Sequence, residues 1–199
     1  MDILYSNIND FSNDEIDSFY QKVYKDKKER IDKYKNDITK KRSIIGEILL
    51  SRLLEKNNFN YEELSFYTNK DGKPYIKDNP IYFNISHSND FVVVVISNKE
   101  IGIDIEKIRD TNINIINQFC TDKEKEYILN SSNIYESLFN IYTLKEAYLK
   151  MKGTNLSQIN NIEFIINKDI ICNDKDISII QIKDIDNYII SIIENKKET

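Results

Sequence analysis

The chain has 199 residues, of which 40% are hydrophobic and 31% charged, a composition typical of a soluble globular protein. No apolar run approaches the roughly 20 residues that a membrane span needs, and the net charge of −5 disfavours nucleic-acid binding. Cys120 and Cys172 are far apart and lack metal-site spacing, so neither a disulfide framework nor a cysteine zinc site is indicated. Because MDILYSNIND lacks the pattern of a secretory signal, we expect a cytoplasmic protein.

The first half of the sequence predicts helices followed by strands. A short strand near 3–7 precedes a helix over about 13–34 and a second helix over 37–56, whose apolar residues recur at the spacing of a buried stripe. LSFYTN, IYFNISHS, FVVVVIS and IGIDIE are then typical of strands. We expect DGKP, residues 71–74, to be the turn between the first two.

The second half repeats this order. Thr121 and Glu124 have the spacing of a capping box at a helix start, and a longer helix is expected over about 134–151, closed by Gly153. Isoleucine-rich strands are predicted at 162–166, 177–182 and 188–193. Helices followed by strands, twice over, predict an α+β fold of two similar lobes, 1–100 and 101–199. Gly72, Gly102 and Gly153 are expected at tight turns, bulges or caps.

Two acidic residues interrupt the isoleucine-rich stretch IGIDIEKIR at 101–109. In a strand, Asp104 and Glu106 point to the same face, so their carboxylates repel each other unless a cation lies between them. Acids on an exposed edge strand that discourage aggregation are the alternative. The pair alone therefore leaves an ion site and an edge-strand device open.

A second charged pattern lies in TLKEAYLKMKG, residues 143–153. On a helix, Glu146 and Lys150 stand at i and i+4 and share one face, which alone indicates only a surface ion pair worth a few tenths of a kcal/mol. Together with Asp104 and Glu106, however, Glu146 provides a third carboxylate where nitrogen ligands are few. Such an oxygen-rich set suits Mg²⁺ and substrate phosphates.

Cations are concentrated in the first quarter of the chain, in KDKKERIDKYK at 25–35 and KKR at 40–42. They predict either a solvated helix face or a phosphate-binding surface. His87, the single histidine, lies in NISHS at a strand end, where a packed or surface histidine is the usual finding. A second histidine or a CxxC motif would be needed to indicate zinc, and SHS lacks the glycines of a serine-hydrolase elbow.

In their order and spacing, the basic helices, GKP, FNISHS, GIDIE and KEAYLK resemble the 4′-phosphopantetheinyl transferases of the surfactin-synthetase-activating (Sfp) type. The resemblance covers about residues 1–195. It implies a monomer of two similar α+β lobes with pseudo-twofold symmetry, the 4′-phosphopantetheinyl transferase fold. It also implies transfer of the phosphopantetheine arm of coenzyme A to a serine of an apo acyl or peptidyl carrier protein, with Mg²⁺ and release of 3′,5′-ADP.

The resemblance also implies roles for individual residues. Asp104, Glu106 and Glu146 match the family's Mg²⁺ ligands, while Glu146 and Lys150 match the catalytic pair, with Glu146 as metal ligand, proton acceptor or both. In the N-terminal lobe, the residues that match coenzyme A contacts are Lys27, Arg30, Arg42, Ser43, Lys73, Ser86 and His87, to which Lys150 adds a phosphate contact.

Two regions differ from the family or are too variable to transfer. The family's tryptophan before the KEA motif is Tyr142 here, which keeps a ring and loses the indole N–H. Segment 111–130 corresponds to the variable carrier-docking region, where Phe119 is a candidate contact.

Two other functions stay open as alternatives: a Mg²⁺-dependent phosphodiester hydrolase and a non-catalytic carrier-binding protein. Neither the natural carrier nor tolerance for acyl-coenzyme A follows from the sequence.

Overall fold

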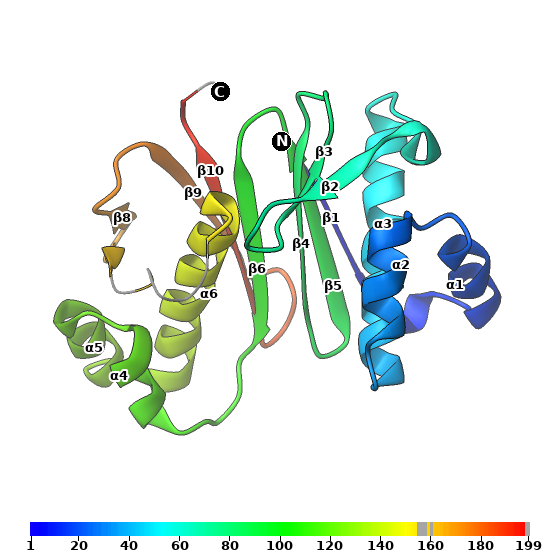
Figure 1. Cartoon of the computed structure of the whole chain (residues 1–199). Helices are drawn as coiled ribbons and strands as arrows, with labels where there is room; N and C mark the ends of the chain where they lie inside the picture. Colours follow the sequence, from blue (N-terminus) through cyan, green and yellow to red (C-terminus); the bar gives the residue numbers. More distant parts are fainter. Residues whose placement is uncertain (155–158, 160, 198–199) are drawn as a thin grey trace. The chain divides into compact units, whose positions relative to one another are not determined.

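The computed structural model describes residues 1–154, 159 and 161–197 (Figure 1). The chain divides into two compact units, Met1–Asn98 (unit 1) and Lys99–Thr199 (unit 2). Within each unit a long helix packs on a three-stranded antiparallel sheet. Among the helices of the described ranges, none combines the length and the apolar character that crossing a bilayer requires.

Unit 1 is built around helix α3 (Asp37–Lys56) and a sheet of strand order β1-β5-β4. Ile45 and Leu49 of α3 and Val92 and Val94 of β5 are buried in one core. Figure 1 shows α3 beside this sheet. The α3 bounds equal those predicted, because Asn36 caps the helix start and the apolar stripe continues to its end. The other elements of unit 1 are β1 (Asp2–Asn7), α1 (Asn13–Tyr20), α2 (Lys25–Asp32), β2 (Phe66–Thr68), β3 (Pro74–Ile76), β4 (Tyr82–Ser88), β5 (Phe91–Ser97) and the 3-10 turns Ile8–Asp10 and Tyr61–Glu63.

The prediction of one helix over 13–34 was wrong, since α1 and α2 are separated by a turn at 21–24. Val23 is buried in that turn, and the ring of Tyr24 stacks on Phe66 with 4.5 Å between centroids. A continuous helix would turn these side chains away from the core. Tertiary packing therefore outweighs the local periodicity.

The turn prediction at DGKP was also incomplete. Asn69–Lys73 turns β2 into β3, a short strand that was not predicted, and β2 and β3 form a separate two-stranded sheet. Gly72 takes φ +88° in this turn, which favours glycine. The predicted strand IYFNISHS instead pairs with FVVVVIS, as β4 and β5.

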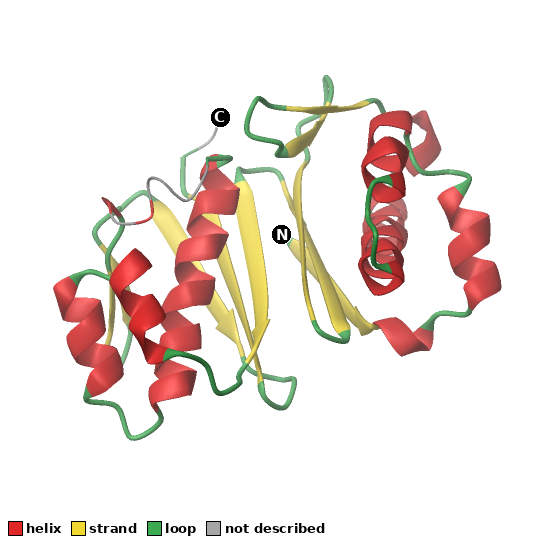
Figure 2. Ribbon diagram, turned by 60° about the horizontal axis from the view of Figure 1, so that its bottom comes forward, coloured by secondary structure: helices red, strands yellow, loops and turns green. Residues whose placement is uncertain are grey.

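Unit 2 has the same plan, with helix α6 (Ile134–Lys152) on a sheet of order β6-β10-β9. Ile141 and Leu144 of α6 share a core with Ile189 and Ile193 of β10, and Figure 2 shows α6 lying along this sheet. The capping box at Thr121 and the left-handed Gly153 cap are both present, as predicted. The other elements are β6 (Ile101–Lys107), the 3-10 turn Ile113–Ile115, α4 (Ile116–Phe119), α5 (Asp122–Leu129), β7 (Phe164–Ile166), β8 (Ile170–Cys172), β9 (Ile177–Ile182) and β10 (Tyr188–Asn195).

The two units are therefore similar α+β structures, as the sequence predicted. The structure adds that each has one long helix on a three-stranded antiparallel sheet. The third and fourth sheets, β2-β3 in unit 1 and β7-β8 in unit 2, are small hairpins that extend this common plan. The twofold relation between the units stays a prediction.

Candidate active site

In unit 2, strand β6 passes unusually close to helix α6, and Gly102 makes this possible. A Cβ atom at Gly102 would lie 2.1 Å from the carbonyl oxygen of Ala147 and 2.3 Å from the amide nitrogen of Met151. Gly102 lies inside the strand and not at a turn, so the expectation of a tight turn or bulge there was wrong. The glycine is required by the backbone of the facing helix.

The same contact defines which face of β6 meets α6. Because side chains alternate along a strand, Asp104 and Glu106 lie on the face of Gly102, toward the helix. Lys150 reaches back from α6, and its Nζ lies 2.6 Å from Oδ1 of Asp104. Strand parity and the i, i+4 spacing of α6 thus converge on one region of unit 2.

Glu146 lies one helical turn before Lys150 and is half-buried. Burial raises its pKa above the usual value for a glutamate, and the negative charges of Asp104 and Glu106 raise it further. The Lys150 charge and a hydrogen bond from Tyr142 oppose this rise. The structure therefore places Glu146 within the electrostatic field of both β6 carboxylates.

Tyr142 lies on α6 one turn before Glu146. Its ring packs edge-on against Phe119, with 5.3 Å between centroids. Burial raises the pKa of the Tyr142 hydroxyl, and the charge of Glu146 raises it further, so the hydroxyl stays protonated and can donate to Glu146. A tyrosine at this position thus supplies a hydrogen-bond donor as well as a ring.

The chemistry of these side chains fits a hard cation, since the carboxylates of Asp104, Glu106 and Glu146 offer only oxygen ligands. Their positions do not form a ready site: among residues 1–154, 159 and 161–197, no three acidic, histidine or cysteine side chains are arranged to hold a metal ion. Cationic side chains of the chain are paired with the β6 acids instead. Besides the Lys150–Asp104 pair, Arg109 Nη1 lies 3.2 Å from Oε2 of Glu106. The donor set therefore fits Mg²⁺ in kind, and the side chains would need to rearrange to bind it.

Unit 1 carries the residues that the resemblance relates to coenzyme A, and Lys27 of α2 has an internal partner there. Its Nζ lies 3.1 Å from Oε1 of Glu47, and the two side chains are 15% and 1% exposed. The Tyr61 hydroxyl donates to the other oxygen of Glu47 at 2.8 Å. Lys27 thus neutralises a buried carboxylate of α3, a structural role that the sequence did not indicate.

Arg30 and Lys73 both belong to the surroundings of the β2–β3 turn. The Arg30 Nη1 donates to the carbonyl oxygen of Gly72 at 3.4 Å, which links α2 to this turn. The backbone N–H of Lys73 donates to Oδ1 of Asn69 at 2.8 Å, and the Lys73 ammonium lies 5.3 Å from the centroid of the Tyr75 ring. The structure therefore brings two of the predicted cations to one turn.

The remaining candidates in unit 1 lie on α3 and β4. Ser43 is buried on α3, and Nε of the neighbouring Arg42 is buried with no hydrogen-bond partner in the described part of the chain. Ser86 is buried and His87 exposed on β4, and as adjacent strand residues they point to opposite faces. Ser86 and His87 therefore do not both face the same side of the β4 strand.

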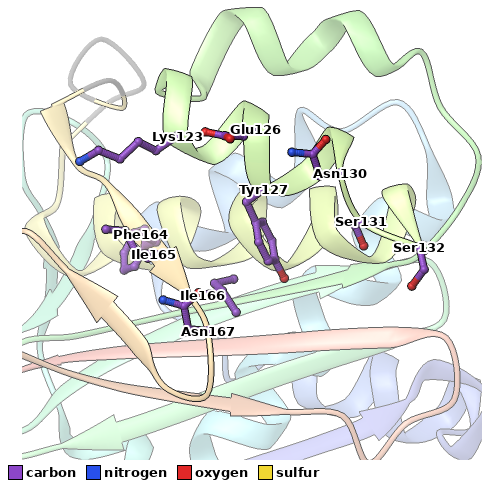
Figure 3. A pocket seen from close by; sticks show the side chains of 10 residues that line it. All are labelled: Lys123, Glu126, Tyr127, Asn130, Ser131, Ser132, Phe164, Ile165, Ile166 and Asn167. Atoms are coloured by element: carbon purple, nitrogen blue, oxygen red, sulfur yellow. The ribbon is translucent and has the colours of Figure 1, made fainter.

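One pocket of unit 2 is lined by residues other than these. It has a volume of about 540 Å³ and is lined by α5, the turn that follows it and strand β7 (Figure 3). Neither the β6 acids nor Glu146 or Lys150 lines it. Phe119, the candidate carrier contact, is also not on the surface, since it is 4% exposed and packs in the unit 2 core.

Sequence reasoning missed the contribution of Lys145, the first residue of the KEA motif, which is fully buried. One signal was present: Lys145 occupies the apolar stripe of α6, at i+4 from Ile141 and i−4 from Leu149. The Arg109–Glu106 and Lys27–Glu47 pairs were also missed. Lys27 and Glu47 lie on separate helices, and Arg109 follows the end of strand β6, which carries Glu106. The periodicity of one helix or strand therefore does not reveal these pairs.

Comparison with known proteins relates both units to one family. Residues 100–193 match the family model of the 4′-phosphopantetheinyl transferase superfamily, and residues 10–99 match that of the 4′-phosphopantetheinyl transferase N-terminal region. The two matches together span residues 10–193, which include every candidate residue named above.

Individual relatives agree with these matches. The chain is 39% identical over 139 residues to 4′-phosphopantetheinyl transferase gsp of Aneurinibacillus migulanus, which covers 67% of this chain and 57% of the relative. It is 27% identical over 150 residues to 4′-phosphopantetheinyl transferase Sfp of Bacillus subtilis, which covers 73% of this chain and 67% of the relative. The crystal structure of Thermotoga maritima holo-[acyl-carrier-protein] synthase is more distant, with 18% identity, a TM-score of 0.43 and coverage of 49% of this chain and 63% of that one.

The match thus spans little more than half the length of the gsp relative. The two family models nevertheless cover nearly the whole of the present chain with one family, and they divide it at residues 99 and 100, beside the boundary between the two units. This chain belongs to the 4′-phosphopantetheinyl transferase superfamily.

Proposed function

We propose that this protein transfers the 4′-phosphopantetheine arm of coenzyme A to a serine of an apo acyl or peptidyl carrier protein, releasing 3′,5′-ADP. The observation that carries the proposal is the convergence of Asp104, Glu106, Glu146 and Lys150 between β6 and α6. Three carboxylates and a lysine on facing elements suit a reaction at a pyrophosphate. The chain's family membership supports carrier-protein modification as the setting of this chemistry.

In the reaction, the serine oxygen forms a bond to the β-phosphorus of coenzyme A while the bond to the departing 3′,5′-ADP breaks. Such a transfer depends on alignment and charge neutralisation more than on covalent catalysis. Asp104, Glu106 and Glu146 are the residues that would hold Mg²⁺, which neutralises pyrophosphate charge when bound. Lys150, released from Asp104, donates to a phosphate oxygen.

Glu146 is the proton acceptor that we assign to the carrier serine, in addition to its role as a third oxygen ligand. Its position on α6, one turn before Lys150 and facing the β6 acids, supports this role, because a general base must lie within reach of the reacting hydroxyl. Glu146→Gln separates the two roles, since the amide keeps an oxygen ligand and loses the proton acceptor. If the variant loses transfer but still binds Mg²⁺, Glu146 acts as the base. If it loses both transfer and Mg²⁺ binding, Glu146 acts as a metal ligand.

Coenzyme A would be held by residues of unit 1, and two observations there support this. Nε of Arg42 is buried without a hydrogen-bond partner in the described residues, which suits an anionic ligand. Arg30 and Lys73 gather at the β2–β3 turn, where two cations suit phosphate groups. Ser43, Ser86 and His87 complete the proposed set. Lys27 contributes to this set through its ion pair with Glu47, which links α2 to α3.

A test with and without a carrier separates this proposal from two rivals. The protein is incubated with coenzyme A and Mg²⁺, and release of 3′,5′-ADP is followed in the presence and absence of an apo-carrier. Release that needs no carrier identifies a phosphodiester hydrolase. Carrier binding with no change in carrier mass identifies a non-catalytic binding protein. Release that requires the carrier, with one arm added per carrier, supports the transferase.

Variants test the site within the same assay. We expect Asp104→Ala and Glu146→Gln to abolish transfer while circular dichroism and cooperative unfolding stay those of a folded protein. Wild-type rates in either variant would contradict the site. A panel of apo acyl and peptidyl carriers, with free and acyl-coenzyme A, defines the substrate range. A monomeric state and a cytoplasmic location are part of the proposal and are tested by light scattering and by cell fractionation.

A further inference from the structure

The first lysine of the KEA motif, Lys145, points away from the β6 acids and into the interior of unit 2. Its side chain is 0% exposed, and its Nζ lies 2.7 Å from Oε2 of Glu124, which is equally buried. The ammonium also donates to the carbonyl oxygens of Phe119 at 2.6 Å and Ile159 at 3.2 Å. A fully desolvated lysine persists only when its partners replace water, and three such partners are present here.

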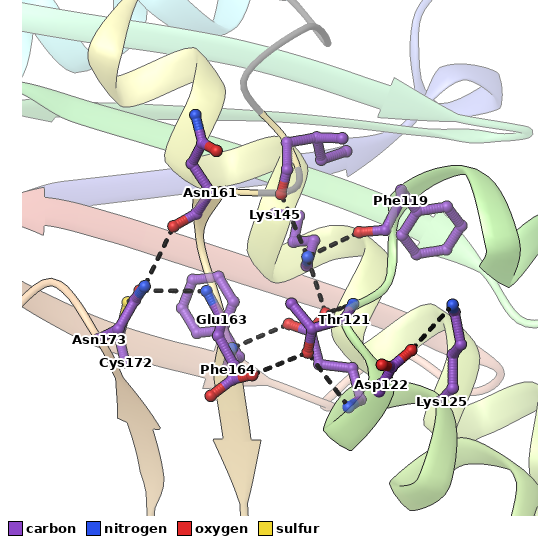
Figure 4. A network of polar contacts seen from close by, with 12 residues as sticks. Phe119, Thr121, Asp122, Lys125, Lys145, Asn161, Glu163, Phe164, Cys172 and Asn173 are labelled. Atoms are coloured by element: carbon purple, nitrogen blue, oxygen red, sulfur yellow. Dashed lines mark hydrogen bonds and ion pairs between the residues drawn. The ribbon is translucent and has the colours of Figure 1, made fainter.

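Glu124 extends this contact into a network that joins three elements. Figure 4 shows Lys145, Thr121 and Phe164 within this network. Its Oε2 accepts from the backbone N–H of Thr121 at 2.8 Å, which completes the α5 capping box, and its Oε1 accepts from the backbone N–H of Phe164 at 2.9 Å. The side chain of Thr121 continues the network by donating to Glu163 at 2.9 Å. The Lys145–Glu124 pair therefore fastens α6 to the start of α5 and to strand β7.

Three consecutive residues of α6 point in three directions, about 100° apart around the helix axis. Lys145 enters the network with Glu124, Glu146 faces the β6 acids, and the Ala147 backbone lies against Gly102 of β6. A rotation or a shift of α6 that moved Glu146 away from β6 would also withdraw Lys145 from its partners. The buried pair and the glycine contact thus fix the same helix at neighbouring positions.

We propose that the Lys145–Glu124 pair is a positioning device for the reaction, which sets the rotation and the height of α6 so that Glu146 and Lys150 meet the β6 acids. This inference rests on the proposed transferase function. A buried ion pair need not add net stability compared with an apolar pair of similar volume. Its hydrogen bonds are directional, however, and they orient α6 in a way that apolar packing of similar volume does not.

The test removes both charges together, so that neither is left buried alone. In the variant Lys145→Met/Glu124→Gln, methionine keeps the length of the lysine stem, and glutamine keeps an acceptor for the capping N–H of Thr121. We expect cooperative unfolding to persist. We expect kcat to fall about 10- to 100-fold, as for a small displacement of catalytic groups, while KM for coenzyme A and for the carrier changes less than about threefold.

A matched control lies on the same helix. Lys152 Nζ lies 3.5 Å from Oδ2 of Asp174, and both side chains are partly exposed. Lys152→Met also removes an α6 lysine from an ion pair, and it should leave kcat and KM near their wild-type values. If the double variant does not fold, Glu124→Gln alone replaces it, because this change keeps both carbonyl partners of Lys145.

The outcomes separate this inference from the function on which it rests. A folded variant with reduced kcat and unchanged KM, beside an active Lys152→Met protein, supports positioning. A folded variant with kcat within about twofold of wild type shows that the pair is only structural and overturns the inference. Failure of the wild-type protein to modify any carrier overturns the proposed function, and the inference with it.

Discussion

Replacing Gly102 by alanine is the sharpest test of how β6 and α6 form the candidate site. The new Cβ would lie 2.1 Å from the Ala147 carbonyl oxygen and 2.3 Å from the Met151 amide nitrogen. Both are backbone atoms of a helix, so no side-chain rotation relieves the overlap. Strand and helix must separate by about 1 Å to restore ordinary van der Waals contact.

This separation has consequences for stability and for activity. Overpacking of this kind costs about 1–3 kcal/mol of the free energy of unfolding, which lowers Tm by about 2–4 °C per kcal/mol in a protein of this size. The same movement lengthens the 2.6 Å contact between Lys150 and Asp104. A displacement of about 1 Å at catalytic groups reduces the rate by about 100-fold. We therefore expect Gly102→Ala to fold, to melt earlier and to lose most of its transfer activity.

Gly46→Ala is the matched control for stability. A Cβ there would meet Cγ2 of Ile85 at 2.8 Å, an atom of a side chain that can turn aside. Alanine also favours the helix over glycine by about 1 kcal/mol, which offsets the displacement of Ile85. Thermal unfolding followed by circular dichroism should show little change for Gly46→Ala. Wild-type stability and activity in Gly102→Ala would refute the close approach of β6 and α6.

Three further changes test other parts of the structure. Lys27→Met leaves the Glu47 carboxylate buried without its cation, so the free energy of unfolding should fall by about 3 kcal/mol in denaturant titrations, whereas unchanged stability would show that Glu47 finds another partner. Lys150→Met removes a cation that competes with Mg²⁺ for the β6 acids. Calorimetry without coenzyme A should therefore show tighter Mg²⁺ binding, although transfer is lost. Weaker Mg²⁺ binding would contradict this competition. The hydrogen bond and charge of Lys123 lower the pKa of Glu163, so its stabilisation is present above the unfolded pKa and is lost as the pH falls through the folded pKa. Glu163→Gln should therefore be less stable than wild type at pH 7 by about 0.5–1 kcal/mol. The difference should disappear as the pH falls below the folded pKa of Glu163, and a difference that does not change with pH would disprove this prediction.

Local patterns were sufficient to predict the elements that form the site. The apolar stripe and the caps gave helices α3 and α6 nearly at their observed bounds, because there periodicity, capping and burial agree. Strand parity placed Asp104 and Glu106 on one face of β6, and helical spacing placed Glu146 and Lys150 on one face of α6. The fold class followed from the repeated order of helices and strands.

The features that were not predicted depend on contacts between distant segments. The break between α1 and α2 follows from the packing of Tyr24 on Phe66, some 40 residues away, and no proline or glycine marks it. Gly102 has an ordinary strand conformation, and its need for glycine comes from a helix about 45 residues later. Lysine is usually found on the surface, and only the three-dimensional structure reveals the buried partners of Lys145.

The most direct test of the account is the intact mass of an apo-carrier protein after incubation with this protein, coenzyme A and Mg²⁺. We predict a mass gain of one phosphopantetheine arm on a single serine, which requires both coenzyme A and Mg²⁺ and is absent with Asp104→Ala. Unchanged mass across apo acyl and peptidyl carriers, with a folded wild-type protein and saturating coenzyme A, would contradict the proposed function.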